Sequence, residues 1–365
     1  MPIYQSHPRV GLVVIADADP VRLAEVGQRH GIHDRYPDLE GVLADDRVDA
    51  VHLLTPVGYH AADAIEVLRA GRHCACAVPM ATSLVDLDAI IDARERARRV
   101  YMMMETSVYG REYLAVEQLH HDGQLGEVTA YRGFHLQNLD GFPRYWQGYP
   151  PMAYSTHALS PVLALLGTSA LRVQCLGSGL LEEHQRGDFD NPFPTEMALF
   201  RLRDSPAVAD VCLSFFQLAR AYTEGFCVYG NRVGVEWPES EGGPMTWHEL
   251  LPAADGRRGR PVTTREFRPP DFADRLPESL AAFTLPGEVT SAGSGTAVRV
   301  SGGHGGSHPH LVHEFVTSIV EGRPSRIDAR TAAAWTAPGI VAHQSALRGG
   351  EALSIPDYEL TGGSP

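Results

Sequence analysis

The first 107 residues alternate short apolar runs with helical segments, and this rhythm constrains the fold more than any other feature. Two runs, 10–16 (VGLVVIA) and 48–54 (VDAVHLL), are apolar almost throughout, as strands buried on both faces require. The other predicted elements are helices at 21–30, 60–70 and 84–98 and strands at 74–78 and 100–104. A repeated β-α pattern predicts a doubly wound parallel sheet, and we assign it to a first domain, residues 1–107.

From residue 108 onward the alternation gives way to strands that follow one another. The predicted elements are helices at 112–121 and 156–166, strands at 128–135, 171–177, 195–203 and 208–216, a loop at 285–307 and a final amphipathic helix through Leu311 and Ile319. This order predicts an α+β domain with an open antiparallel sheet, residues 108–365. An open sheet face favours self-association, so we expect a homo-oligomer.

Composition excludes several classes of function. All 31 basic residues are arginine, which rules out a Schiff-base lysine, a lysine general base and a Walker-type phosphate loop. The net charge of -14 argues against nucleic acid or an anionic membrane as the main partner. Five scattered cysteines show no zinc-ligand spacing, so we expect no metal. Without a signal peptide or a long apolar stretch, the expected location is the cytoplasm.

The start of the chain lacks a feature that a dinucleotide-binding sheet needs. In a Rossmann unit an acidic residue that holds the ribose follows the glycine-rich phosphate loop by about 20 residues. Asp17 ends the strand predicted at 10–16, and counting back leads beyond Met1. We therefore expect the central first strand and its loop to be missing. Met1 is then an internal methionine, or, less favoured, the start of a working truncated fold.

Three segments together resemble the Gfo/Idh/MocA family of nicotinamide-dependent sugar oxidoreductases. They are IADADP at 15–20, TPVGYH at 55–60 and AGRHCACAVPMA at 70–81. The resemblance implies a Rossmann fold that binds NAD, with NADP disfavoured by the carboxylate of Asp17. The cofactor-binding residues it implies are Asp17, Thr55, Pro56, His60, Val78, Pro79 and Glu105. The alternatives are a turn-forming role for Asp17, a helix-start histidine for His60 and a local cap for Glu105.

Two departures from the family pattern bear on the reaction. The family has an E-K-P segment whose lysine assists hydride transfer. In this chain Val78 takes the place of that lysine, and the sequence contains no other lysine. In the substrate helix, the D-x-G-x-H pattern has become Ala153-Tyr154-Ser155-Thr156-His157, which keeps only the histidine. These changes count against a plain sugar dehydrogenase.

A branch of the family, the NAD-dependent α-N-acetylgalactosaminidases, is similar at the same places. It also has valine before the proline, and its M-M-x-E-N-x-x-Y and Y-P-T-H-G-L-G-P segments resemble residues 102–109 and 154–161. Thr106 and Ser155 depart from those patterns. The resemblance implies a redox-neutral cleavage, in which NAD⁺ oxidises the sugar at C3, a base removes the C2 proton and the C1 substituent leaves.

The resemblance places the chemistry on residues of the second domain. It makes His157 and Tyr154 the catalytic acid/base pair, because histidine titrates near neutrality and tyrosine can act as a base if its pKa is lowered. The alternative is a packed tyrosine beside a structural histidine. The candidate residues for binding a sugar or glycoside are Tyr109, Arg144, Trp146 and His304. The alternatives are hinge packing for Tyr109, packing of a long loop for Arg144 and Trp146, and a solvated loop for His304.

Three functions follow from these patterns. The leading hypothesis is a redox-neutral, NAD-dependent enzyme that cleaves a glycoside. The second is a net NAD-dependent sugar dehydrogenase that uses His157. The third is a non-catalytic or decayed member of the family, which the missing first strand favours.

Overall fold

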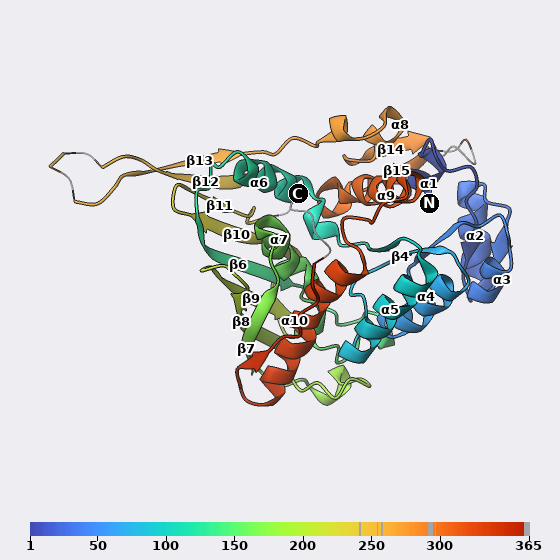
Figure 1. Ribbon diagram of the computed structural model, residues 1–365, viewed down its shortest axis with the longest axis horizontal. Coiled ribbons are helices and arrows are strands. Elements are labelled where there is room, and N and C mark those ends of the chain that lie inside the picture. Colours follow the sequence, from blue (N-terminus) through green and yellow to red (C-terminus); the bar gives the residue numbers. More distant parts are fainter. Residues whose placement is uncertain (241, 254, 257, 291–294, 296, 361–365) are drawn as a thin grey trace. The chain divides into compact units, whose positions relative to one another are not determined.

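The computed structural model describes residues 1–240, 242–253, 255–256, 258–290, 295 and 297–360. The chain divides into two compact units (Figure 1). Unit 1 comprises Met1–Ala81, Val85–Arg111 and Asp271–Ala332, and unit 2 comprises Thr82–Leu84, Glu112–Pro270 and Ala333–Pro365. None of the helices within the described ranges is long and apolar enough to cross a membrane.

Unit 1 contains the predicted parallel strands and their covering helices. The strands are β1 (Ile15–Ala16), β2 (Arg35–Tyr36), β3 (Ala50–Leu53), β4 (His73–Cys76) and β5 (Tyr101–Met103). The helices along this stretch are α1 (Pro2–Ser6), α2 (Pro20–His30), α3 (Leu39–Leu43), α4 (His60–Arg69) and α5 (Leu84–Ala97), with single 3₁₀ turns η1 (Val57–Tyr59) and η2 (Thr106–Val108). Every strand pair here is parallel, which confirms a Rossmann-type α/β unit.

The parallel strands of unit 1 form two separate sheets, β1-β2 and β3-β4-β5. In the six-stranded order 3-2-1-4-5-6 they correspond to strands 3-2 and 4-5-6. No strand in the described ranges takes the central place between them, where the sequence predicts the first strand to be missing. The strand predicted at 10–16 is correspondingly short: only Ile15–Ala16 pairs, and Leu12 is 41% exposed. An apolar run without a neighbouring strand on one side has no ladder to extend it.

Residues 271–332 pack with unit 1, whereas the sequence assigns them to the second domain. The described elements are η6 (Ala273–Arg275), α8 (Glu278–Ala281), β14 (Gly287–Thr290), β15 (Ala297–Val300) and α9 (Gly303–Glu321). Long-range bonds explain the packing: Met103 N–H donates to the Ile327 carbonyl and Ser325 to the Tyr101 carbonyl. The loop predicted at 285–307 is wrong in part, because it holds the β14-β15 hairpin and the start of α9.

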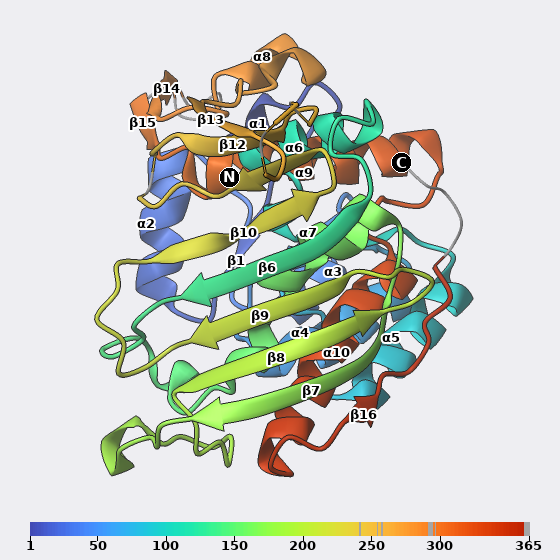
Figure 2. The same ribbon diagram turned by 90° about the vertical axis from the view of Figure 1, so that its left-hand side faces the viewer.

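Unit 2 is built on one nine-stranded sheet (Figure 2). The strands are β6 (Val128–Leu136), β7 (Ala170–Ser178), β8 (Thr195–Leu202), β9 (Val208–Ser214), β10 (Thr223–Gly230), β11 (Val233–Glu236), β12 (Met245–Leu250), β13 (Val262–Phe267) and β16 (Leu353–Ser354). Their order is β13-β12-β11-β10-β6-β9-β8-β7-β16. The sheet is mixed rather than antiparallel, because β6 and β9 pair in parallel.

Helices α6 (Arg111–His121), α7 (Thr156–Leu166) and α10 (Ala329–Leu347) accompany this sheet. Helix α7 lies directly on β6, since a Cβ at Gly133 would come within 2.0 Å of the Ala158 carbonyl oxygen. Helix α10 follows the helix that the sequence predicts to be the last. Its many small residues, among them the fully buried Ala333 and Ala337, give no amphipathic stripe to detect.

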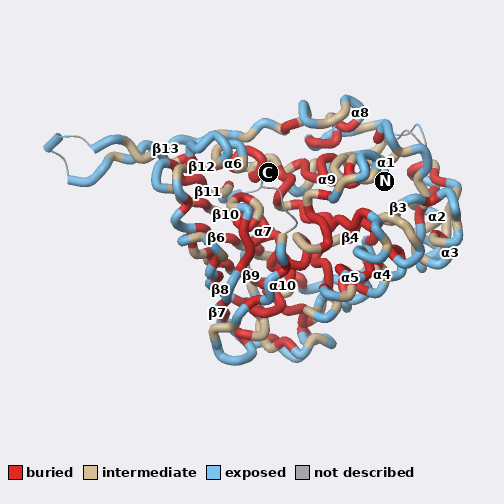
Figure 3. Tube along the Cα trace, in the orientation of Figure 1, coloured by how far each residue is buried: buried red, intermediate tan, exposed pale blue. Residues whose placement is uncertain are grey.

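The outward face of the sheet is apolar in part. Leu176, Met197 and Cys212 are cross-strand neighbours in one row, and Leu176 and Met197 are 60% and 51% exposed. By contrast, β6 and β9 bury every second side chain on the other face. Strand β13 is exposed along nearly its whole length (Figure 3), which explains why its sequence lacks the alternation that marks a strand.

Candidate active site

The candidate cofactor residues of unit 1 all follow strands at their carboxyl ends. Asp17 comes directly after β1, Thr55-Pro56 after β3, Val78-Pro79 after β4 and Glu105 after β5. Because β3, β4 and β5 are parallel neighbours, the segments after them lie at one edge of their sheet. Ligands of open α/β sheets bind outside this edge. The topology therefore brings the positions after β3, β4 and β5 to one edge, whereas Asp17 follows a strand of the separate β1-β2 sheet.

Asp17 has the geometry of a ribose-binding carboxylate. Its Oδ1 accepts the N–H of Asp19 at 2.8 Å, and its Oδ2 lies 3.5 Å from Arg22 Nη1. The side chain is 30% exposed, which leaves an oxygen within reach of a hydroxyl donor. Asp19 in turn caps α2 by accepting the N–H groups of Val21 and Arg22. The turn fixes the carboxylate without enclosing it.

His60 serves as a brace between two strand-end loops. The side chain is buried, and its Nδ1 lies 2.7 Å from the Pro79 carbonyl oxygen. Its Nε2 lies 2.9 Å from the Thr55 carbonyl oxygen. Both ring nitrogens therefore face main-chain acceptors, and the contact with a cofactor stays a prediction for His60. The histidine joins the segments that carry Thr55 and Pro79.

Other predicted residues of unit 1 have local partners. The carboxylate of Glu105, fully buried, accepts the Ser107 N–H at 2.9 Å and so caps η2. Tyr109 is buried, with the Arg326 guanidinium 5.6 Å from its ring centre. Val78 is 8% exposed and precedes Pro79 through a cis peptide bond.

These residues fit the two ends of a dinucleotide. Asp17 suits the adenosine ribose, and the segments at Thr55 and Val78 follow the strands beside which a nicotinamide binds in such folds. Residues 1–111 contain no glycine-rich G-x-G-x-x-G loop, which is the part of a Rossmann unit that cradles the pyrophosphate.

In unit 2 the structure brings Tyr154 and His157 into contact. Tyr154 ends a 3₁₀ turn, η4 (Pro151–Tyr154), and α7 begins two residues later, so the pair straddles the helix start. Their rings meet edge to face, with centroids 5.1 Å apart and an interplanar angle of 67°. His157 is 4% exposed. The predicted acid/base pair is thus one local arrangement of side chains.

The segment before η4 contributes to the same group. Trp146, in the turn η3 (Arg144–Trp146), meets the Tyr154 ring edge to face at 5.3 Å. Arg144 is exposed. Tyr149 lies 6.1 Å from Tyr154, and burial raises the pKa of its phenol well above the usual value. The high pKa reflects a poorly solvated surrounding, in which electrostatic interactions are stronger than in water.

Sequence reasoning missed His135, which lies at the centre of this group. It is 2% exposed on β6, and its ring lies 5.8 Å from that of Tyr154 and 5.5 Å from that of His157. Phe215 and Tyr222 complete the surroundings of the ring, at 5.1 Å and 5.7 Å. The signal was present in the alternation of β6: Tyr131, Gly133 and His135 occupy successive positions on the buried face.

His304 lies in unit 1, at a non-helical turn that opens α9. Its φ of 50° is in the left-handed region, and its ring is 5.5 Å from that of His308. His304 is exposed there, and its contact with a sugar stays a prediction. No cluster of three or more His, Cys, Asp or Glu side chains within the described ranges could hold a metal ion.

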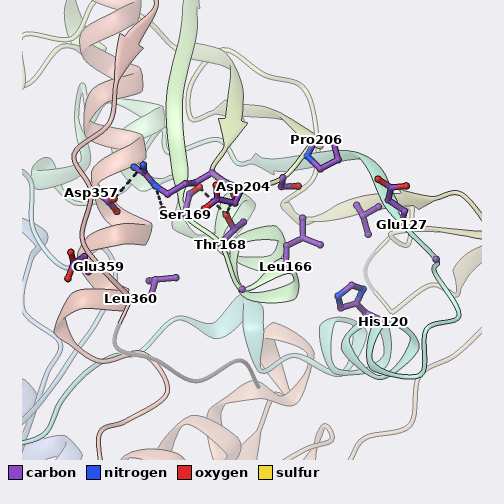
Figure 4. A pocket seen from close by; sticks show the side chains of 15 residues that line it. His120, Glu127, Leu166, Thr168, Ser169, Asp204, Pro206, Asp357, Glu359 and Leu360 are labelled. Carbon is purple, nitrogen blue, oxygen red and sulfur yellow. Dashed lines mark hydrogen bonds and ion pairs between the residues drawn. The ribbon is translucent and has the colours of Figure 1, made fainter.

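A cavity of unit 2 contains none of the predicted site residues (Figure 4). It measures 640 Å³ and lies at the opposite, carboxyl-terminal end of α7, beside Leu166 and Gly167. Its acidic lining residues are Glu127, Asp204, Asp357 and Glu359. Arg203 lies 3.4 Å from Asp357 and donates to Ser169 at 3.2 Å.

The fold is that of an NAD-binding enzyme, built from a Rossmann unit and a mixed-sheet unit. Residues 1–105 match the Gfo/Idh/MocA family model, which is described as an oxidoreductase family with an NAD-binding Rossmann fold. The chain therefore carries a domain of this family, and its cofactor is NAD.

Over most of its length the chain is similar to proteins named glycosyl hydrolase family 109. One from Streptomyces coelicolor is 26% identical over 358 residues, covering 92% of this chain and 72% of that protein. One from Saccharopolyspora erythraea is 24% identical over 390 residues, covering 98% and 80%. Among solved structures, levoglucosan dehydrogenase in complex with NADH and levoglucosan shares the fold, with a TM-score of 0.76, 20% identity and coverage of 98% and 95%.

Proposed function

We propose that the protein cleaves a glycoside without net redox change, through transient oxidation at C3 of the sugar and elimination across C2 and C1. The observation that carries the proposal is the pairing of Tyr154 and His157 in a chain without any lysine. Two proton-transfer groups are more than a simple hydride transfer needs. Similarity to glycosyl hydrolase family 109 proteins supports the same reaction.

The residue before Pro79 separates this reaction from plain dehydrogenation. In sugar oxidoreductases that this chain resembles, a lysine there assists the reacting hydroxyl. Val78 has no group that can donate or accept a proton, and it is 8% exposed. The proton chemistry must then come from unit 2, where His157 and Tyr154 are the candidates.

We assign His157 to the C3 hydroxyl and Tyr154 to C2. His157 accepts the hydroxyl proton as the C3–H hydride leaves, and Tyr154, as phenolate, removes the C2 proton that the new ketone acidifies. The C1–O bond then breaks and the departing oxygen takes a proton. Water adds at C1, and each proton returns by the reverse path. The N-terminus of α7, which carries partial positive charge, favours the negative charge that develops beside His157.

Unit 1 carries the residues that would bind the cofactor. Asp17 would accept hydrogen bonds from the adenosine ribose, and the segments after β3 and β4 would flank the nicotinamide. When bound, the cofactor would supply a hydride acceptor as NAD⁺ and a hydride donor as NADH. His60 holds the loops at Thr55 and Pro79 together through its contacts with their carbonyl oxygens.

Solvent exchange tests the elimination. Turnover of an aryl glycoside panel in D₂O should place deuterium at C2 of the recovered sugar, with catalytic NAD and no accumulation of NADH. The competing function is a net sugar dehydrogenase that uses His157 alone. It predicts one NADH per turnover and no deuterium at C2. That result would exclude the glycosidase proposal.

Tyr154→Phe sharpens this test, because it keeps the ring and removes only the hydroxyl. The variant should lose C2 exchange while enzyme-bound NADH still forms in a single turnover. Tyr145→Phe is the matched control, since Tyr145 belongs to the same segment, is 47% exposed and contacts Trp146 rather than His157. Retained C2 exchange in Tyr154→Phe would remove Tyr154 from the role of base.

Several narrower features remain predictions of this proposal. Tyr109, Arg144, Trp146 and His304 are expected to contact the sugar, and the apolar row at Leu176 and Met197 is expected to meet a second copy of the chain. A role in carbohydrate metabolism follows from the proposed reaction, and the cytoplasmic location expected from the sequence stays a prediction.

A further inference from the structure

A buried carboxylate holds the turn that presents Tyr154. Glu196 on β8 is fully buried, and its Oε2 accepts the Met152 N–H at 2.7 Å. Met152 lies in η4, two residues before Tyr154. The first N–H groups of a helical turn have no partner within the turn, so the carboxylate satisfies one that would otherwise be buried and unpaired. A hydrogen bond to a carboxylate is roughly twice as strong as one between neutral groups.

The second oxygen of the same carboxylate reaches helix α10. Glu196 Oε1 lies 2.7 Å from His343 Nδ1, and the His343 side chain is 15% exposed. A buried carboxylate is costly unless both oxygens have donors, and here both do. The side chain of Glu196 therefore joins three elements of unit 2: β8, the η4 turn and α10.

Helix α10 contacts the turn a second time, one helical turn before His343. A Cβ on Gly339 would lie 2.1 Å from the Met152 carbonyl oxygen and 2.5 Å from Ser155 Oγ. Residues four apart share one face of a helix, so Gly339 and His343 present a single surface to this turn. The glycine permits the close approach, and the histidine fixes the carboxylate that holds the turn from the sheet side.

We infer that Glu196 and His343 are positioning residues, which set the place of the Tyr154 phenol against His157. The inference rests on the proposed function, which makes Tyr154 the base at C2. Neither residue belongs to the ring group around His135 among the contacts described. They act on Tyr154 through the main chain of residues 152–154. Glu196 accepts the Met152 N–H, and His343 contacts the other oxygen of the same carboxylate.

The position of Tyr154 can be measured without any substrate. Protein labelled with 3-fluorotyrosine gives one ¹⁹F resonance per tyrosine, and the resonance that Tyr154→Phe removes is that of Tyr154. Glu196→Ala should shift or broaden this resonance, and His343→Ala should do so to a smaller extent. Ser345→Ala is the matched control: Ser345 is fully buried on the same helix but bonds the Cys175 N–H and the Glu351 carbonyl. It should leave the Tyr154 resonance in place.

Activity supplies the second readout. A misplacement of about 1 Å can cost on the order of 10²-fold in rate, so Glu196→Ala should lower kcat by about that factor with NAD affinity unchanged. Glu196→Gln should recover most of it, because the amide oxygen can accept the Met152 N–H and the amide nitrogen can donate to His343. In a Tyr154→Phe background, Glu196→Ala should cost little more.

The outcomes separate the positioning role from the proposed function. An unmoved Tyr154 resonance in Glu196→Ala, or losses of kcat that multiply fully in the double variant, would overturn the positioning role. A shifted resonance in a protein that shows no C2 exchange would uphold it and reject the glycosidase reaction instead. If Glu196→Ala does not fold, His343→Ala carries the same two readouts, with Glu196→Gln and Ser345→Ala as references.

Discussion

Units 1 and 2 present their candidate residues in different ways. In unit 1 the candidates Thr55, Val78 and Glu105 follow neighbouring parallel strands, and the sheet topology places them at the edge where ligands of such sheets bind. In unit 2 the candidates converge through packing: His135 comes from β6, His157 from α7 and Trp146 from the turn before it. Positions fixed by topology leave short local motifs in a sequence, whereas positions fixed by packing do not.

The difference also separates two tasks. Unit 1 carries the residues suited to hold a dinucleotide, and unit 2 carries the buried rings and titratable groups suited to proton transfer. Substitutions in one unit should therefore change one task and leave the other intact.

His157→Ala should reduce turnover by about 10²–10⁴-fold while NAD binding is unchanged, because loss of a positioned acid/base has this cost. Steady-state rates and NAD titration by calorimetry measure the two properties in one preparation. His184→Ala is the control, since His184 has a side chain that is 70% exposed and lies outside the ring group. Weakened NAD binding in His157→Ala would show that the two tasks are not separable.

Asp17→Ala should change cofactor selection without removing the acid/base pair. Hydrogen bonds to a charged group contribute about 1.5–3 kcal/mol, so NAD affinity should fall by roughly tenfold or more. Loss of the negative charge should also relax the rejection of the NADP phosphate. Dissociation constants for both cofactors give the ratio directly, with Asp19→Ala as the neighbouring control for the α2 cap. An unchanged ratio would contradict the ribose-binding role.

The accuracy of the sequence predictions also differs between units 1 and 2. The helix at 156–166 is predicted to the residue, and the strand-end positions of Asp17, Thr55 and Pro79 follow from the β-α rhythm. His60 illustrates a limit, because its two main-chain acceptors depend on how the loops after β3 and β4 fold. A motif gives the position of a residue, but the contacts decide between binding and bracing.

Unit 2 shows the other limit. His135, Glu196 and His343 come from β6, β8 and α10, far apart in sequence, and no spacing rule connects them. Helix α10 was not predicted because its many small residues are buried on most sides and leave no amphipathic pattern. Strand β13 was not predicted because it is exposed on both faces and lacks alternation. Residues 271–332 were assigned to the wrong unit because hydrogen bonds such as that from Ser325 to Tyr101 are invisible in a linear pattern.

Acid should destabilise unit 1 through His7. Its Nδ1 accepts the Arg9 N–H at 3.1 Å, so the ring is neutral and Nε2 can donate to His313 Nδ1, also 3.1 Å away. Burial is the main cause that lowers the pKa of His7 to about 4. The unfolded chain takes up a proton near pH 6.5, before the folded protein does, so this contribution is complete above that pH and is lost as the pH falls toward 4.

We expect the free energy of unfolding to fall by up to about 2 kcal/mol between pH 7 and pH 5 on account of His7. His7→Asn keeps an acceptor for Arg9 and should flatten this part of the pH profile in urea denaturation. His184→Asn, at an exposed position, should not. An equally steep profile in His7→Asn would assign the acid sensitivity to other groups.

The smallest effect is expected at the carboxyl-terminal end of α7, where the 640 Å³ cavity lies. The helix has 11 residues, so about 15 Å of rise separates this end from His157. Its carbonyl end carries partial negative charge, and Glu127, Asp204 and Glu359 add to it, so the cavity disfavours developing negative charge. Asp204→Asn should leave kcat/KM within about twofold of wild type. Asparagine tolerates the positive φ of 52° at that position, so folding should be unaffected. A loss comparable to that of His157→Ala would instead place the chemistry in the large acidic cavity, and the ring group around His135 would then be packing alone.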